Sequence, residues 1–149
     1  MCFASAIVYN YRMIHNSESC RSNCPINFVL ETFGDKWTLL VIRDLMFKGK
    51  RYYGEFLDSN EKISTNILAD RLQRLESKGV IEKQIDPENR SKLIYRLTAK
   101  GKDLLPVMLE ITAWSSKHDS QTNTPAPFVA ALEQDKVALS RKILTDLDH

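Results

Sequence analysis

Residues 64–79 read STNILADRLQRLESKG, and this stretch decides the fold that we expect. Ser64 is a favourable N-cap, and Gly79 suits the left-handed conformation that commonly follows the last turn of a helix. The three leucines of the first twelve residues fall on one face at helical spacing, which predicts an amphipathic helix over residues 65–78. These leucines are Leu68, Leu72 and Leu75.

The opposite face of this predicted helix is polar and carries side chains that can read bases. Asn and Gln can make bidentate contacts to adenine, and Arg can reach guanine or phosphate. Asp70 on the same face has three open interpretations: it repels phosphate, it accepts a hydrogen bond from cytosine, or it pairs with Arg74 one turn later. The polar face comprises Asn66, Ala69, Asp70, Gln73, Arg74 and Ser77.

The neighbouring segments place this helix in a larger motif. A short helix over 53–57 and a polar turn over 58–62 precede it, and two β-rich runs, 80–85 and 93–97, follow around a basic loop. This order predicts an α+β, mostly helical, winged helix-turn-helix fold, with the helix in the major groove and the hairpin tip on the backbone or minor groove. The alternative is an ordinary domain with a solvated polar surface. The expected DNA contacts are Arg51, Lys62, Ser64, Thr65, Asn66, Gln73, Arg74, Arg90 and Lys92.

Further helices are expected on both sides of the motif. One covers 25–33 and ends at a left-handed Gly34, and the next is capped by Asp35 and runs to Phe47, followed by a brief strand at 50–52. Another covers 99–118, where Pro106 either bends the helix or marks a late start. The expected organisation is a flexible arm (1–23), the winged helix-turn-helix domain (24–118), a linker (119–127) and one C-terminal helix (128–149).

Charge is distributed unevenly along the chain. Residues 36–102 carry 15 lysines and arginines against 9 aspartates and glutamates, a net of +6, whereas residues 1–35 carry −1 and residues 103–149 carry −3. A basic segment between neutral or acidic flanks is typical of a protein that binds a polyanion such as DNA. An unevenly charged solvated surface explains the same numbers.

A series of short motifs follows in order along the chain: CP at 24–25, GDKW at 34–37, TLLVIRDL at 38–45, TNILADRL at 65–72, RLE at 74–76, YRLTAKG at 95–101 and DLLP at 103–106. In these motifs the chain resembles the HxlR-type family of winged helix-turn-helix transcription regulators, relatives of the MarR group. The hairpin departs from the family, because SKLIY at 91–95 stands where many relatives carry Pro-Lys/Arg-Val-Glu-Tyr. The resemblance implies a sequence-specific regulator that binds a pseudo-palindromic double-stranded operator.

The resemblance also implies a homodimer built from the N-terminal helix and the long helix near Trp114. An apolar stripe that exceeds what one small domain needs to cover agrees with this expectation. The stripe could instead pack on its own core or on the C-terminal helix. The expected interface residues are Met108, Ile111 and Trp114.

Cys24 is a candidate redox sensor. It precedes Pro25 at the start of a helix, where backbone N–H groups and the helix dipole can stabilise a thiolate. Some family members resemble redox or electrophile sensors that act through a cysteine here, so a small-molecule or electrophile effector is a possible partner. The alternative is a small buried residue beside Trp37, and Arg21 is the one nearby cation.

Other classes of function find little support in the sequence. The three histidines are scattered and no phosphate loop or metal motif occurs, so we expect neither catalysis nor a cofactor. The three cysteines lack the paired spacing of a zinc site. No apolar run could span a bilayer, and we expect a soluble, cytoplasmic protein without a membrane partner. The remaining alternative is a winged-helix module that binds protein instead of DNA, which should expose apolar residues on the helix at 65–78.

Overall fold

The structure is a computed structural model that describes residues 21–148. The chain divides into two units, one that ends at Gly34 and one that begins at Asp35. The described part of the first unit contains helix α1 (Pro25–Phe33), as predicted. The flexible arm expected over residues 1–23 lies outside the described residues except for its last three.

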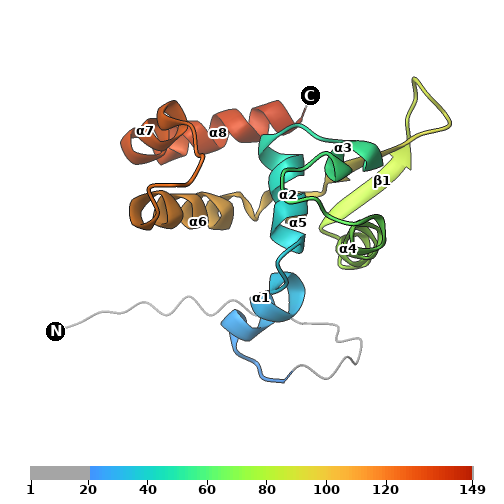
Figure 1. Ribbon diagram of the computed structural model, residues 1–149, viewed down its shortest axis with the longest axis horizontal. Coiled ribbons are helices and arrows are strands. Elements are labelled where there is room, and N and C mark those ends of the chain that lie inside the picture. The colour runs from blue at the N-terminus through green and yellow to red at the C-terminus, as the bar shows by residue number, and fades with distance from the viewer. Residues whose placement is uncertain (1–20, 149) are drawn as a thin grey trace. The chain divides into compact units, whose positions relative to one another are not determined.

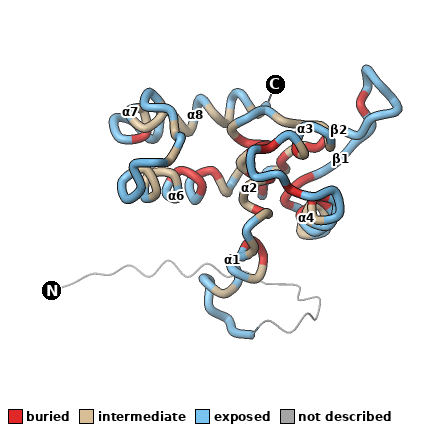
Figure 2. The backbone as a smooth tube through the Cα atoms, viewed as in Figure 1, coloured by how far each residue is buried: buried red, intermediate tan, exposed pale blue. Residues whose placement is uncertain are grey.

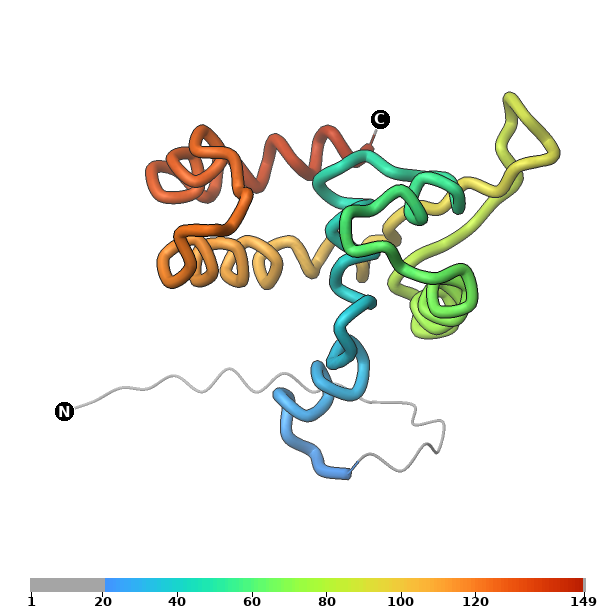
Figure 3. The backbone as a smooth tube through the Cα atoms, viewed as in Figure 1, coloured from blue at the N-terminus to red at the C-terminus, as the bar shows by residue number. Residues whose placement is uncertain are grey.

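The second unit contains the helix-turn-helix elements, a two-stranded sheet and a helical C-terminal part. In Figure 1, helix α2 runs through this unit with α3, α4 and the sheet on one side and α6, α7 and α8 on the other, and Figure 3 traces the same path by residue number. The elements are α2 (Thr38–Phe47), α3 (Tyr53–Leu57), α4 (Thr65–Ser77), β1 (Ile81–Ile85), β2 (Leu93–Leu97), α5 (Ala99–Lys102), α6 (Leu105–His118), α7 (Ala126–Gln134) and α8 (Lys136–Leu147).

Helix α2 forms the centre of the core because its sequence is apolar nearly all round. Ile42 and Leu45 are fully buried, and the buried positions in Figure 2 follow α2, the inner face of α4 and strand β2. Helix α2 contacts β2, α4 and α8, so it joins the two sides of the unit. It ends at Phe47 with Lys48 as its C-cap, and the following Gly49 takes a positive φ of 64°, a conformation that costs glycine little.

The sheet is an antiparallel hairpin, as the two β-rich runs predict. Ile81 lies opposite Leu97, and Ile85 lies opposite Leu93 at the outer end. A single bridge between Tyr52 and Ile94 adds the short strand expected at 50–52. The hairpin is therefore attached along β2 to the segment that leads into α3.

Three sequence expectations about helix ends need correction. Gly34 ends α1 with φ −76° and is not left-handed; a Cβ there would lie 2.1 Å from the carbonyl oxygen of Leu30, so glycine is required by close approach. The helix expected over 99–118 is broken before Leu105, which makes Pro106 the mark of a late start. The single C-terminal helix is two helices, because Asp135 leaves helical geometry and its side chain accepts a hydrogen bond from the N–H of Ala138, 2.9 Å away.

Candidate nucleic-acid interface

The N-terminal end of α4 is built as the sequence predicts. The hydroxyl of Ser64 accepts a hydrogen bond from the N–H of Ile67 at 3.4 Å and so caps the helix. The three leucines of the inner face are buried, with Leu68 at 0% exposure. In contrast, Thr65 and Asn66 are exposed, so their side chains can reach a partner placed against this end of the helix.

An ion-pair network fixes α4 against the start of α2. Nε of Arg71 lies 2.9 Å from Oδ1 of Asp35, and the same oxygen accepts hydrogen bonds from the N–H groups of Trp37 and Thr38 at 2.8 and 3.0 Å. Burial alone would raise the pKa of Asp35, but the hydrogen bonds from Thr38, Trp37 and Arg71 outweigh it and lower the pKa to about 2. The Asp35 carboxylate therefore holds the first turn of α2 and one side of α4 together.

Asp70 pairs with Arg71 in this structure. The sequence left three interpretations open for Asp70, and this pair with Arg71 is none of them. Asp70 remains exposed beside its partner, on the outer face of α4. The Arg71 guanidinium thus pairs with two carboxylates, that of Asp35 next to α2 and that of Asp70 on the outer face of α4.

The turn over residues 58–62, before α4, is held by contacts with the buried carboxylate of Asp44. Asp44 is 2% exposed, and its Oδ2 lies 2.7 Å from Nζ of Lys50 and 2.5 Å from the hydroxyl of Ser59. Arg43 bridges Asp44 and Glu61, with Nη1 at 2.5 Å from Oε1 of Glu61. Arg43 lowers the pKa of Glu61 to about 2 through its hydrogen bond and charge. Helix α2 and the turn over 58–62 are therefore joined by ionic contacts.

Two tyrosines connect the α3 region to its neighbours, Tyr53 to the start of α4 and Tyr52 to the hairpin loop. The hydroxyl of Tyr53 donates to the carbonyl of Thr65 at 2.7 Å and ties α3 to the start of α4. The hydroxyl of Tyr52 donates to Oδ2 of Asp86 at 2.7 Å, and Nζ of Lys92 lies over the Tyr52 ring, 5.4 Å from its centroid. Sequence reasoning missed both tyrosines and also Arg71, because their partners lie 12 to 36 residues away in the chain.

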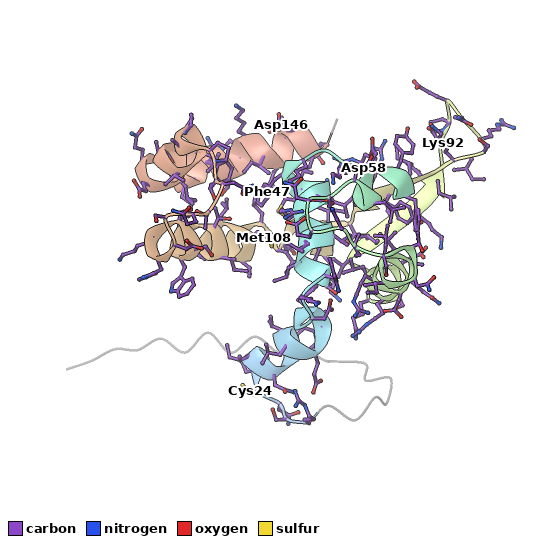
Figure 4. The ribbon with its side chains drawn as sticks, in the orientation of Figure 1. Cys24, Phe47, Asp58, Lys92, Met108 and Asp146 are labelled. Carbon is purple, nitrogen blue, oxygen red and sulfur yellow. The ribbon has the colours of Figure 1, made fainter. Side chains whose placement is uncertain are left out.

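Most of the expected DNA contacts are exposed on α4, the turn before it and the hairpin loop. Figure 4 labels Lys92, which extends from the loop between the strands. Arg51 differs, because its Nη1 donates to the carbonyls of Leu45 and Lys50 at 2.7 and 2.9 Å. The guanidinium of Arg51 is thus engaged by the main chain, and we remove it from the candidate contacts. The exposed candidates are Lys62, Ser64, Thr65, Asn66, Gln73, Arg74, Arg90 and Lys92.

The residues expected at the dimer interface divide into two groups. Met108 is only 6% exposed, so it belongs to the core of its own chain and offers little surface to a partner. Ile111 and Trp114 are 43% and 67% exposed and remain candidates for the interface. Of these three residues, Met108 is the one that packs internally, as the alternative expected.

Cys24 is a free, exposed cysteine and is not buried beside other side chains. It forms the N-cap of α1 through its backbone, without a side-chain hydrogen bond. Arg21 is occupied elsewhere: its Nε lies 3.2 Å from Oε1 of Glu31, and its Nη2 lies 3.0 Å from the amide oxygen of Asn27.

Residues 21–148 contain neither a cluster of metal ligands nor a helix suited to cross a membrane. Within residues 21–148, no group of three or more histidine, cysteine, aspartate or glutamate side chains is arranged to hold a metal ion. None of the helices in that same part of the chain combines the length and the apolar character that a membrane crossing requires.

Comparison with known proteins agrees with this architecture. An HTH-type transcriptional regulator of Synechocystis sp., sll1512, is 41% identical over 86 residues, which cover 58% of this chain and 63% of that protein, slightly under two thirds of its length. The HTH-type transcriptional regulator YodB of Bacillus subtilis is 36% identical over 95 residues, covering 63% of this chain and 84% of YodB.

Solved structures show the same fold. The reduced form of YodB superposes with a TM-score of 0.54 at 31% identity, over 67% of this chain and 98% of that one. The oxidised form of the redox regulator HypR gives a TM-score of 0.56 at 28% identity, over 63% of this chain and 96% of that one. The model of the HxlR-like helix-turn-helix family matches residues 32–123. The chain therefore belongs to the HxlR-like helix-turn-helix family and is a transcription regulator of the helix-turn-helix type.

Proposed function

We propose that this regulator binds double-stranded DNA by placing the first turns of α4 in the major groove and the β1–β2 hairpin on the adjacent backbone or minor groove. The observation that carries the proposal is the division of α4, whose leucines are buried while its polar side chains near the N-terminus are exposed. The hairpin loop adds Arg90 and Lys92, both exposed. This arrangement suits direct readout by α4 and phosphate contacts by the loop.

A gel-shift titration against the DNA upstream of the chain's own gene, at two salt concentrations, tests this proposal. Asn66→Ala and Gln73→Ala should each weaken specific binding by about tenfold, since a good bidentate contact contributes roughly 1–3 kcal/mol of discrimination. Gln134→Ala removes an exposed amide from α7 and is the matched control. Binding that ignores salt, or that responds equally to Gln134→Ala, would contradict the proposal.

The active form is a homodimer in this proposal. Two recognition helices about one turn of DNA apart, roughly 34 Å, are needed to read a two-fold operator. Ile111 and Trp114 are exposed large apolar residues on α6 and would be covered by a second copy. The exposed part of α1 offers further apolar surface, with Ile26 at 67% and Leu30 at 56% exposure.

Oxidation of Cys24 is the regulatory input that we propose. The thiol is exposed and can meet an oxidant or electrophile, and two solved relatives are a redox regulator and a quinone-bound regulator. Cys24→Ser should abolish any effect of oxidant on DNA binding, measured by gel shift with and without peroxide. An unchanged oxidant response in Cys24→Ser would remove Cys24 from the mechanism.

Protein binding by α4 is the weaker candidate. A protein-binding version of this helix would expose large apolar side chains, whereas the exposed positions of α4 are polar apart from Ala69. We therefore retain DNA as the partner.

A further inference from the structure

A pocket of about 720 Å³ lies between α2, α6 and the α7–α8 pair. Small-molecule sites in proteins typically measure about 300–1,000 Å³, so this volume suits a ligand of ordinary size. Figure 4 labels three of its residues on three helices: Phe47 on α2, Met108 on α6 and Asp146 on α8. The family match ends at residue 123, so α7 and α8 complete this pocket with a segment that lies outside the matched region.

The walls of the pocket are apolar and partly aromatic. Phe47 and Phe128 meet edge to face, with ring centroids 5.8 Å apart and ring planes at 73°. Half-buried rings of this kind favour a flat aromatic ligand, which can pack edge to face on one ring and offset on the other. The aliphatic part of the wall comprises Leu39, Leu40, Met108, Ile111, Ile143 and Leu147.

The charged groups around the pocket determine which aromatic ligands it favours. Arg43 is paired with Glu61, and Lys48 lies 3.7 Å from the buried carboxylate of Asp44. Arg51 donates to main-chain carbonyls. Asp146, by contrast, lines the pocket without a salt bridge to any described residue. The basic side chains are thus already compensated, and the carboxylate that remains available favours a hydrogen-bond donor or a cation.

We propose that this pocket binds an aromatic amine, neutral or protonated, with its rings packed against the Phe47–Phe128 pair and its N–H directed to Asp146. Neutral polar side chains at the border, such as Asn123 and Thr112, can add hydrogen bonds. Asn60 and Glu61 also line the pocket and belong to the turn before α4. A bound ligand would therefore contact the segment that leads into the DNA-reading helix, and this last coupling rests on the proposed function above.

The test uses two fluorescent probes that differ by one charged group. N-phenyl-1-naphthylamine is a neutral aromatic amine, and 8-anilinonaphthalene-1-sulfonate is its sulfonated counterpart. We expect saturable binding of the neutral probe to the full-length protein without DNA, and binding of the sulfonate about threefold weaker or more, because repulsion by a partly exposed carboxylate is modest. Asp146→Asn should narrow this difference between the probes.

Filling variants localise the probe to the pocket. Ile143→Trp fills it from α8 and should weaken probe binding by at least about tenfold, equivalent to about 1.4 kcal/mol. Val137→Trp adds the same side chain at an exposed position of α8 that does not line the pocket, and it should bind the probe as the wild type does. Asn123→Trp fills the pocket from the exposed loop and serves if Ile143→Trp fails to fold.

Loss of probe binding in Ile143→Trp or Asn123→Trp, with retention in Val137→Trp, supports the site. No saturable binding, equal binding in all variants, or tighter binding of the sulfonate overturns it. Because the titration contains no DNA, its failure would leave the proposed operator binding intact. Failure of the gel shift would equally leave the pocket intact.

Discussion

Removal of the Asp35 carboxylate should loosen α4 from α2 and destabilise the whole second unit. Asp35→Ala loses the hydrogen bonds to the first turn of α2, and loss of such a cap costs typically about 1 kcal/mol. It also loses the ion pair with Arg71, whose side chains are only 24% and 19% exposed and which adds about 1 kcal/mol. We therefore expect Asp35→Ala to lower the free energy of unfolding at pH 7 by about 2 kcal/mol.

Asp35→Asn removes the charge but keeps a side chain that can cap the helix, because asparagine is itself a good N-cap residue. The folded-state pKa of Asp35 is lowered from 3.8 to about 2, so the ionised side chain stabilises the fold above pH 4. This stabilisation is lost as the pH falls through 4 toward 2, where the carboxyl becomes protonated. The stability gap between wild type and Asp35→Asn should be about 1–2 kcal/mol at pH 7 and should close over that interval.

Urea unfolding followed by circular dichroism, at pH 7 and at several values between 4 and 2, measures both effects. The comparison with Asp35→Asn matters because other carboxylates, Glu61 among them, titrate in both proteins and cancel in the difference. A gap that stays constant from pH 7 to pH 2 would refute the role assigned to the charge. An Asp35→Ala protein within about 0.5 kcal/mol of wild type would refute the role of the cap as well.

Three further outcomes follow from the contacts described above. Gly101→Ala should lower the unfolding midpoint in urea by the equivalent of about 1–3 kcal/mol, because the new Cβ would lie 2.2 Å from the carbonyl oxygen of Val80, whereas Gly54→Ala meets nothing within 4 Å and should be neutral or slightly stabilising. Lys92→Ala should weaken DNA binding similarly on all sequences and reduce the slope of log K against log salt by about 1 in gel shifts. Ile111→Glu combined with Trp114→Ala should shift the protein toward monomer in sedimentation velocity, and an unchanged dimer would contradict that interface.

The elements of the DNA-reading half could be predicted from the sequence because each carries local signals. Ser64 and Gly79 bound α4, the leucines fix its inner face, and the β-rich runs on either side of residues 86–92 define the hairpin. These signals act within a few residues, and the observed bounds agree closely with the predicted ones. Asp135 was also a local signal for a helix start, but the continuing apolar pattern on both sides concealed it.

What the sequence could not predict depends on contacts between distant segments. The engagement of Arg51 by main-chain carbonyls follows from the path of the chain between α2 and α3, and side-chain type alone suggests a DNA contact. Met108 and Ile111 share one apolar pattern, yet the α7–α8 pair covers part of this face of α6 and leaves the rest exposed. The pocket could not be predicted for the same reason, because its walls come from four helices spread over more than 100 residues.

The attachment of the hairpin to the segment before α3 has a mechanical consequence for any duplex that the protein binds. The N–H of Tyr95 donates to the carbonyl of Arg51 at 2.8 Å, and the Tyr52–Asp86 contact fixes the loop from its other side. Because of these contacts the hairpin can move little, and the distance between the recognition helix and the hairpin loop is nearly fixed. A binding site whose grooves are spaced differently would have to bend or twist to fit, so base steps that no side chain touches would influence affinity through their stiffness.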